Sequence, residues 1–144
     1  MKANSRIIEA LRRIPGLAGC SDRELGKIAA HLAYGAVQSG DILTRQDRVA
    51  RQGYLIIAGE AVARRDGVVV GRLGPGELVG EMALLEGIVR SATVAAETAM
   101  ELFVFDTSEF SRLMDEPAFA KLVARQLSTR LRDSDARVGQ TTAT

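Results

Sequence analysis

The chain has 144 residues, of which 47% are apolar and 26% charged, and its 19 basic and 18 acidic side chains leave a net charge of +1. This size and composition are typical of one soluble globular domain with a hydrophobic core. The near-zero net charge excludes a global field that would draw the protein to nucleic acid or an anionic membrane, so any anion must be bound by a local site.

The first part of the chain carries two helical signals. Residues 4–13 have apolar side chains at helical spacing and are followed by a Pro-Gly pair. Ser21, with Glu24 three residues later, forms a capping box that opens a second helix. We therefore expect helices over residues 4–34.

From residue 36 to residue 106, short apolar runs alternate with glycine and charged residues. This pattern is typical of an all-β sandwich or barrel. The Asp66-Gly67 pair, which separates two of the runs, predicts a hairpin turn. The expected strands are 41–45, 53–59, 60–65, 67–73, 90–96 and 100–106.

The last part of the chain is again helical. A capping sequence after residue 106 predicts a short helix, and Pro117 begins a longer one, so that two closing helices occupy 107–132. An apolar stripe along the longer helix either packs in the core or forms the seam of a homodimer. We expect residues 1–132 to form a single domain and the polar residues 133–144 to be disordered.

Cys20 is the only cysteine and His31 the only histidine. An internal disulfide and a Cys/His zinc cluster are therefore excluded, and a multi-histidine metal site, a Ser-His-Asp triad and a metal-dependent β-barrel enzyme are strongly disfavoured. No apolar run approaches the ~20 residues of a membrane span, and the start of the chain lacks the apolar core of a signal peptide. We expect a cytoplasmic protein without a metal.

Residues 79–94, VGEMALLEGIVRSATV, contain the main functional signal. The stretch 82–86 consists of good helix formers and predicts a short helix inside the β region. The free N–H groups at the start of a helix form an anion site. Gly80 allows close approach to the backbone, Arg90 supplies a planar charged fork that suits phosphate, and Ser91 adds a hydroxyl donor.

Glu81 decides what kind of anion fits. A carboxylate beside a phosphate site repels the anion unless it accepts a hydrogen bond from another part of the ligand, such as a sugar hydroxyl. A 3′,5′-cyclic nucleotide satisfies Glu81 and Arg90 together. The structural alternative is an internal salt bridge between these two side chains on a surface loop.

The segment GELVGEMALLEGIVRSATV resembles the phosphate-binding cassette of cyclic-nucleotide-binding domains, the family found in catabolite activator proteins, protein kinase A regulatory subunits and cyclic-nucleotide-regulated channels. LRRIPGLAGCSDRELGKIAAHL resembles the N-terminal helices, and GYLIIAGEAVA the central strand pair. The resemblance covers nearly the whole chain. It implies an α+β fold: an eight-stranded β jelly roll or barrel over 36–106, flanked by N-terminal helices and two C-terminal helices, with a short phosphate-binding helix inserted.

The resemblance also implies a non-enzymatic regulatory domain that signals to an unknown effector protein. Glu81 would bind the ribose 2′-hydroxyl and Arg90 the cyclic phosphate of cAMP, which we favour over cGMP. Val70 and Gly71 would lie near the base, and the lid helix would offer Arg125 or Arg130. The full implied set of ligand contacts is Gly80, Glu81, Met82, Ala83, Arg90, Ser91, Ala92, Val70 and Gly71.

The chain departs from the family pattern at three places. Arg45-Gln46-Asp47-Arg48 stands where the pattern has glycine followed by an acid, Gly53 where a large apolar residue is common, and Val79 where an aromatic is frequent. None of these positions is a ligand contact. They concern the shape and packing of the loop 46–53.

Two further functions stay open. A transcription regulator of this family carries a helix-turn-helix domain after the long helix, and only 12 residues follow position 132, so we expect no direct DNA binding unless the chain is a fragment. A domain that keeps the fold and has lost its ligand would act as a protein-protein interaction module.

Overall fold

The computed structural model describes the backbone of residues 2–49, 51–80 and 92–142, and the side chains of residues 5–49, 51–80 and 92–129. The helices are α1 (Lys2–Arg12), α2 (Asp22–Ala29), α4 (Thr107–Leu113) and α5 (Pro117–Thr142). The strands are β1 (Ala33–Val37), β2 (Ile42–Thr44), β3 (Gln52–Ala58), β4 (Ala61–Arg65), β5 (Val68–Leu73), β6 (Leu78–Val79), β7 (Thr93–Ala96) and β8 (Met100–Asp106).

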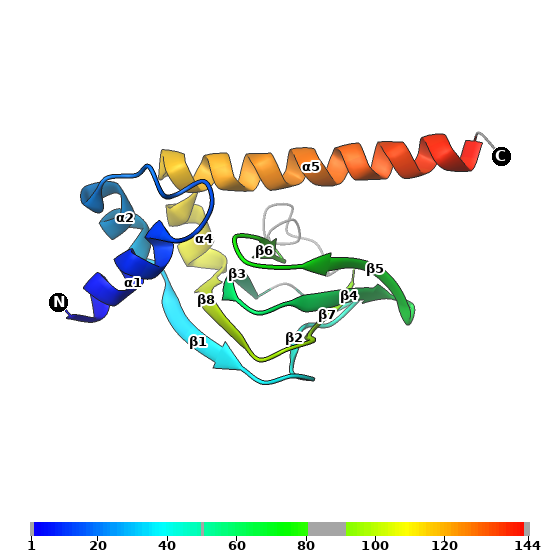
Figure 1. Ribbon diagram of the computed structural model, residues 1–144, viewed down its shortest axis with the longest axis horizontal. Coiled ribbons are helices and arrows are strands. Elements are labelled where there is room, and N and C mark those ends of the chain that lie inside the picture. The colour runs from blue at the N-terminus through cyan, green and yellow to red at the C-terminus, as the bar shows by residue number, and fades with distance from the viewer. Residues whose placement is uncertain (1, 50, 81–91, 143–144) are drawn as a thin grey trace.

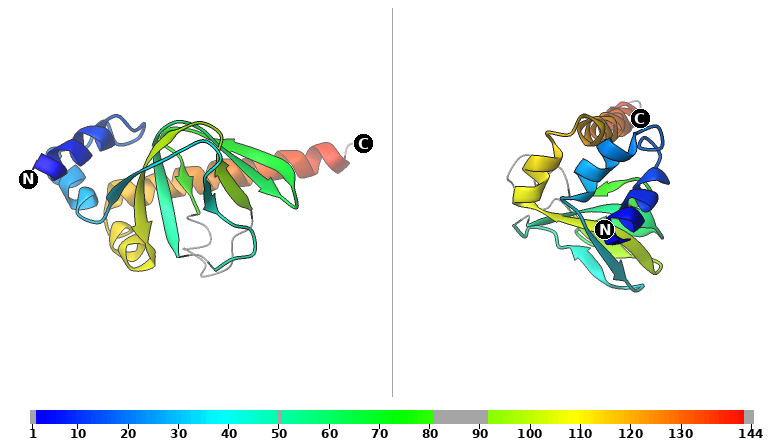
Figure 2. Two further views of the ribbon diagram at one scale, coloured as in Figure 1. Left: turned by 90° about the horizontal axis from the view of Figure 1, so that it is seen from below. Right: turned by 90° about the vertical axis from the view of Figure 1, so that its left-hand side faces the viewer.

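The strands of the described residues form two four-stranded antiparallel sheets, with the orders β1-β8-β3-β6 and β2-β7-β4-β5. The turn at Asp66-Gly67 joins β4 to β5, as the sequence predicts. Helices α1, α2 and α4 gather at one end of the sandwich, and α5 runs from that end along its length (Figures 1 and 2). The predicted α+β jelly roll with flanking helices is confirmed.

The sheet β1-β8-β3-β6 lies between the helices and the other sheet, because alternate side chains of its strands enter two different hydrophobic cores. In β3, Leu55 packs with the helices, and Ile56 packs between the sheets. In β6, Leu78 and Val79 divide in the same way, and both are almost fully buried. A strand of only two residues is thereby fixed on both of its faces.

An aromatic cluster ties the closing helices to the sheet. The Phe105 ring of β8 lies 5.7 Å from that of Phe110 in α4 and 5.8 Å from that of Phe119 in α5, measured between centroids. The contact with Phe119 is edge-to-face, an arrangement that aromatic pairs favour. The start of α5 is therefore anchored in the core.

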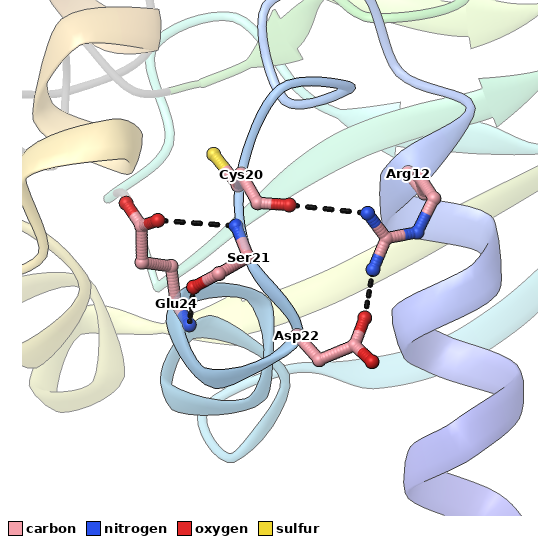
Figure 3. Close-up of polar contacts among 5 residues, drawn as sticks. All are labelled: Arg12, Cys20, Ser21, Asp22 and Glu24. Atoms are coloured by element: carbon pink, nitrogen blue, oxygen red, sulfur yellow. Dashed lines mark hydrogen bonds and ion pairs between the residues drawn. The ribbon is translucent and has the colours of Figure 1, made fainter.

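Polar contacts fix the junction between α1 and α2 (Figure 3). The predicted capping box is present: Glu24 N–H donates to Ser21 Oγ at 3.2 Å, and Ser21 N–H donates to Glu24 Oε1 at 3.0 Å. The bond from the Ser21 backbone is the main reason why the pKa of Glu24 lies below its usual range. Arg12 pairs with Asp22 and donates to the Cys20 carbonyl at 3.1 Å, which holds the two helices together.

The structure corrects two expected helix ends. The second helix ends at Ala29 instead of continuing to residue 34, and Tyr34 and Gly35 belong to β1. Gly35 is a strand residue opposite Leu102, because pairing with β8 outweighs the local tendency of glycine to end a helix. At the other end, α5 runs to Thr142, beyond the expected helix end near residue 132. A polar sequence without proline does not by itself stop a helix.

Candidate functional site

The structure describes four of the nine predicted ligand contacts. Val70 and Gly71 lie in β5, Gly80 follows β6, and Ala92 precedes β7. The other predicted contacts, and the predicted helix over 82–86, lie outside the described residues: Glu81, Met82, Ala83, Arg90 and Ser91. Because β6 and β7 belong to different sheets, the chain passes from one sheet to the other between Gly80 and Ala92. We call residues 80–92 the cassette segment.

The start of the cassette segment is held by α5. The side-chain amide of Gln126 accepts a hydrogen bond from Leu78 N–H at 2.6 Å and donates one to the Leu78 carbonyl at 2.5 Å. Two residues later, Gly80 has a φ of 82°, a left-handed conformation that glycine adopts without strain. The C-terminal helix is thus bonded to the backbone immediately before the cassette segment.

The end of the cassette segment is held by β2 and the loop after it. Thr44 Oγ1 donates to the Ala92 carbonyl at 3.2 Å, and the Thr44 residue is 5% exposed. Gln46 N–H donates to Thr93 Oγ1 at 2.9 Å. This bond from a buried hydroxyl fixes the position of Ala92, because leaving a buried hydroxyl unpaired would be costly.

Gly71 lies in the same sheet as the end of the cassette segment, two strands away. The pairs Ala63–Gly71 and Ala63–Val94 place Gly71 and Val94 on either side of one β4 residue. Two strand spacings amount to about 10 Å, a distance that the base, sugar and phosphate of one nucleotide can bridge. Gly71 and the strand that follows the cassette segment are therefore close enough for one nucleotide to reach both.

The structure leaves open space beside Gly71. Strand alternation places Gly71 on the same face as Leu73, which packs against the core between the sheets. A β-carbon at Gly71 would nevertheless have no described atom within 4 Å. A glycine in the middle of a strand often marks a place where a ligand approaches the backbone.

Arg125, one of two candidates for a base contact, points toward the N-terminal helices. Its Nη1 atom would lie 3.3 Å from a β-carbon built on Gly16, in the connection between α1 and α2. The side chain of Arg130, the other candidate, lies outside the described residues. No group of three His, Cys, Asp or Glu side chains among the described residues could hold a metal ion. None of the helices, within the described part, combines the length and the apolar character needed to cross a membrane.

Sequence reasoning missed three residues that position the site: Thr44, Gln46 and Gln126. Gln126 left a detectable signal, because it lies three residues after Val123 and next to Leu127, both on the apolar side of α5. A polar side chain at such a position needs a partner. Thr44 and Gln46 carry no comparable signal, since their partners are 48 and 47 residues away in the sequence.

Residues 35–117 match the family model described as the cyclic nucleotide-binding domain. The chain belongs to the cyclic nucleotide-binding domain family. This finding confirms the resemblance on which the sequence interpretation rests. The matched region begins in β1, contains both sheets and ends at the start of α5.

Relatives of several kinds share this domain. The cAMP-dependent protein kinase regulatory subunit of Schizosaccharomyces pombe is 39% identical over 105 residues, which are 72% of this chain and 26% of that protein. A cAMP-binding acyltransferase from Mycobacterium smegmatis superposes with a TM-score of 0.79 at 25% identity, over 92% of this chain and 43% of that chain. The catabolite activator protein of Thermus thermophilus superposes with a TM-score of 0.74 at 25% identity, over 92% of this chain and 63% of that chain. This chain spans about a quarter of the length of the curated kinase regulatory subunits that it matches.

Proposed function

We propose that this domain binds a 3′,5′-cyclic nucleotide at the cassette segment, with cAMP preferred to cGMP, and that it regulates an effector protein without catalysing a reaction. Arg90 binds the cyclic phosphate together with the backbone amides of Met82 and Ala83. Glu81 accepts the ribose 2′-hydroxyl, and the base lies against Gly71 in β5.

One observation supports the proposal: both described ends of the cassette segment are held in place, and open space lies beside Gly71. Gly80 and Ala92 are each fixed by hydrogen-bonded neighbours, and Gly71 leaves open space two strands from the end of the cassette segment. The choice of ligand is supported by relatives whose names include cAMP, among them the yeast kinase regulatory subunit and the mycobacterial acyltransferase.

The signal leaves the site through α5. Gln126 links this helix to Leu78, so a ligand that shifts Gly80 also changes the fit between α5 and β6. A ligand can shift such an equilibrium only by its difference in affinity for the two arrangements. The effector protein then responds to the position of α5.

The phosphate contact is tested by replacing Arg90 with alanine and titrating the wild type and the variant with cAMP and cGMP by calorimetry. A charge-assisted contact is worth about 1.5–3 kcal/mol, so Arg90→Ala should weaken binding by roughly 10- to 100-fold. Unchanged affinity would remove Arg90 from the site.

The base contact is tested in the described part of the chain. Gly71→Leu should block binding by filling the space beside β5, while Gly19→Leu, which also adds a side chain in open space, should leave affinity unchanged. If the wild type binds neither nucleotide at saturating concentration, the domain is an interaction module with a lost ligand site.

A further inference from the structure

The loop between β2 and β3 surrounds a hollow of about 200 Å³ that contains none of the described nucleotide contacts. Its floor is formed mainly by apolar surface of Leu43 and of the Tyr54 ring, whose hydroxyl donates to the Leu43 carbonyl at 3.1 Å, and Gln52 and the buried Thr44 also line it. Its rim is formed by Arg45, Arg48 and Arg51, together with Val49. The hollow thus combines an apolar floor with a basic rim.

Within the described part of the chain, the arginines of the rim have no acidic partner. None of Arg45, Arg48 and Arg51 makes an ion pair with another described residue, and all three are exposed. Asp47 is the only acid in the loop, which leaves it with a net charge of +2, against +1 for the whole chain. The loop therefore carries a concentration of positive charge that the ion pairs between described residues do not neutralise.

The loop is held in place from three sides. Gln46 N–H donates to Thr93 in β7, and the Gln46 side chain exchanges two hydrogen bonds of 2.8 Å with Asp66 in the hairpin turn. The Arg51 carbonyl accepts a bond from Thr107 Oγ1 at the start of α4. Because these bonds already fix the loop at Gln46 and at Arg51, a partner that binds the rim loses less free energy to ordering these residues.

The size of the hollow indicates what occupies it. Pockets for small organic ligands usually measure roughly 300–1,000 Å³, so about 200 Å³ suits one apolar side chain better than a free metabolite. Val49 is 70% exposed and adds apolar surface at the rim. Arginine forks bind carboxylates with two parallel hydrogen bonds.

We propose that this basic hollow is a docking site for an acidic segment of a partner protein, in which one apolar side chain enters the hollow and flanking carboxylates pair with Arg48 and Arg51. Charge complementarity selects this occupant. The loop also holds the end of the cassette segment through Thr93, so the partner binds next to the proposed nucleotide site. The docking proposal does not depend on nucleotide binding.

The test uses the whole chain and two fluorescein-labelled peptides, GEELEEG and GEESEEG, with binding measured by fluorescence anisotropy. The leucine peptide should bind more tightly than the serine peptide. The double variant R48E/R51E should lose about tenfold or more in affinity for the leucine peptide. Val49→Ser should reduce the difference between the two peptides.

The matched control is R6E/R23E, which changes the net charge equally at two exposed arginines of α1 and α2. It should retain binding, and circular dichroism melting should show that all variants fold. An equal loss in R6E/R23E, equal binding of both peptides, or no binding by the wild type at millimolar peptide would overturn the proposal. The proposal would also be overturned if neither peptide bound while phosphatidylserine vesicles or polyphosphate bound in a way that required Arg48 and Arg51. Titration of the same variants with cAMP by calorimetry measures nucleotide affinity independently, so that a failure of the docking proposal can be told apart from a failure of the nucleotide proposal.

Discussion

Gly59 lies between β3 and β4, where neighbouring backbone atoms leave no space for a side chain. Its φ is 90°, and a β-carbon there would lie 2.3 Å from the Ala99 carbonyl oxygen and 2.9 Å from Met100 Cα. Asp47 is also left-handed, with a φ of 65°, at the position where the family pattern has glycine. Aspartate tolerates this conformation better than most residues. The replacement of the family's glycine by Asp47 therefore keeps the left-handed turn of the backbone while changing the charge of the loop.

The close approach at Gly59 predicts a large loss of stability in Gly59→Ala. Gly40→Ala is the matched control, since Gly40 has a φ of 94° but no described atom within 4 Å of a β-carbon. Both variants carry the cost of a left-handed alanine, about 1 kcal/mol or more, and only Gly59→Ala adds a clash with backbone. Urea unfolding should show a clearly larger decrease in the free energy of unfolding for Gly59→Ala. Equal decreases would mean that the β3–β4 connection can relax.

At the scale of elements, the sequence predicted the helices and turns that are specified by residues close to one another in the chain. The capping box of α2, the β4–β5 hairpin and the start of α5 at Pro117 all follow from residues within a few positions of each other. The strands β1 and β6 could not be predicted in this way. β1 exists because it pairs with β8, about 65 residues further along the chain, and β6 has only two residues.

The start of α4 shows a local signal with a pH-dependent consequence. Asp106 caps the helix by accepting bonds from Glu109 N–H at 2.8 Å and Ser108 Oγ at 2.9 Å. These bonds, chiefly the one from the Glu109 backbone, hold the pKa of Asp106 below its ordinary value. A group with a lowered folded-state pKa stabilises the protein above its unfolded pKa, and this contribution is lost as the pH falls through the folded pKa.

Asp106→Asn should therefore lower the melting temperature near neutral pH and reduce the further loss on acidification, because asparagine still caps the helix and does not titrate. The measurement is a series of thermal melts from about pH 6 to about pH 3, on either side of the ordinary aspartate pKa. Asp115→Asn is the control, since the Asp115 side chain makes no hydrogen bond to another described residue. If both variants show the wild-type dependence on pH, the cap does not contribute to acid stability.

At the scale of the whole molecule, the sequence yields a prediction for the ligand contacts of the candidate site but not for the residues that hold its ends. Glu81 and Arg90 lie in one continuous motif, so the kind of ligand follows from local spacing. The residues that fix the ends of the cassette segment, Thr44 and Gln126, each bind a partner 48 residues away. Such contacts depend on the folded arrangement of sheets and helices and leave little trace in a single sequence.

The bond pair between Gln126 and Leu78 makes the last prediction, which concerns the coupling of α5 to the sandwich. Gln126→Leu removes both of these bonds to the backbone of the buried residue Leu78, and losing a bond to a buried backbone group costs about 1–3 kcal/mol. Hydrogen exchange should then become faster at Leu78. Under the proposed function, saturating cAMP should slow exchange in α5 of the wild type and should do so much less in the variant, because the helix no longer responds to the shift of Gly80. Gln126→Glu keeps the acceptor for Leu78 N–H and loses the donor to its carbonyl, so it should give an intermediate result. Equal protection of α5 by cAMP in all three proteins would show that the signal reaches the helix by another route, with the Phe105–Phe119 contact as the first candidate.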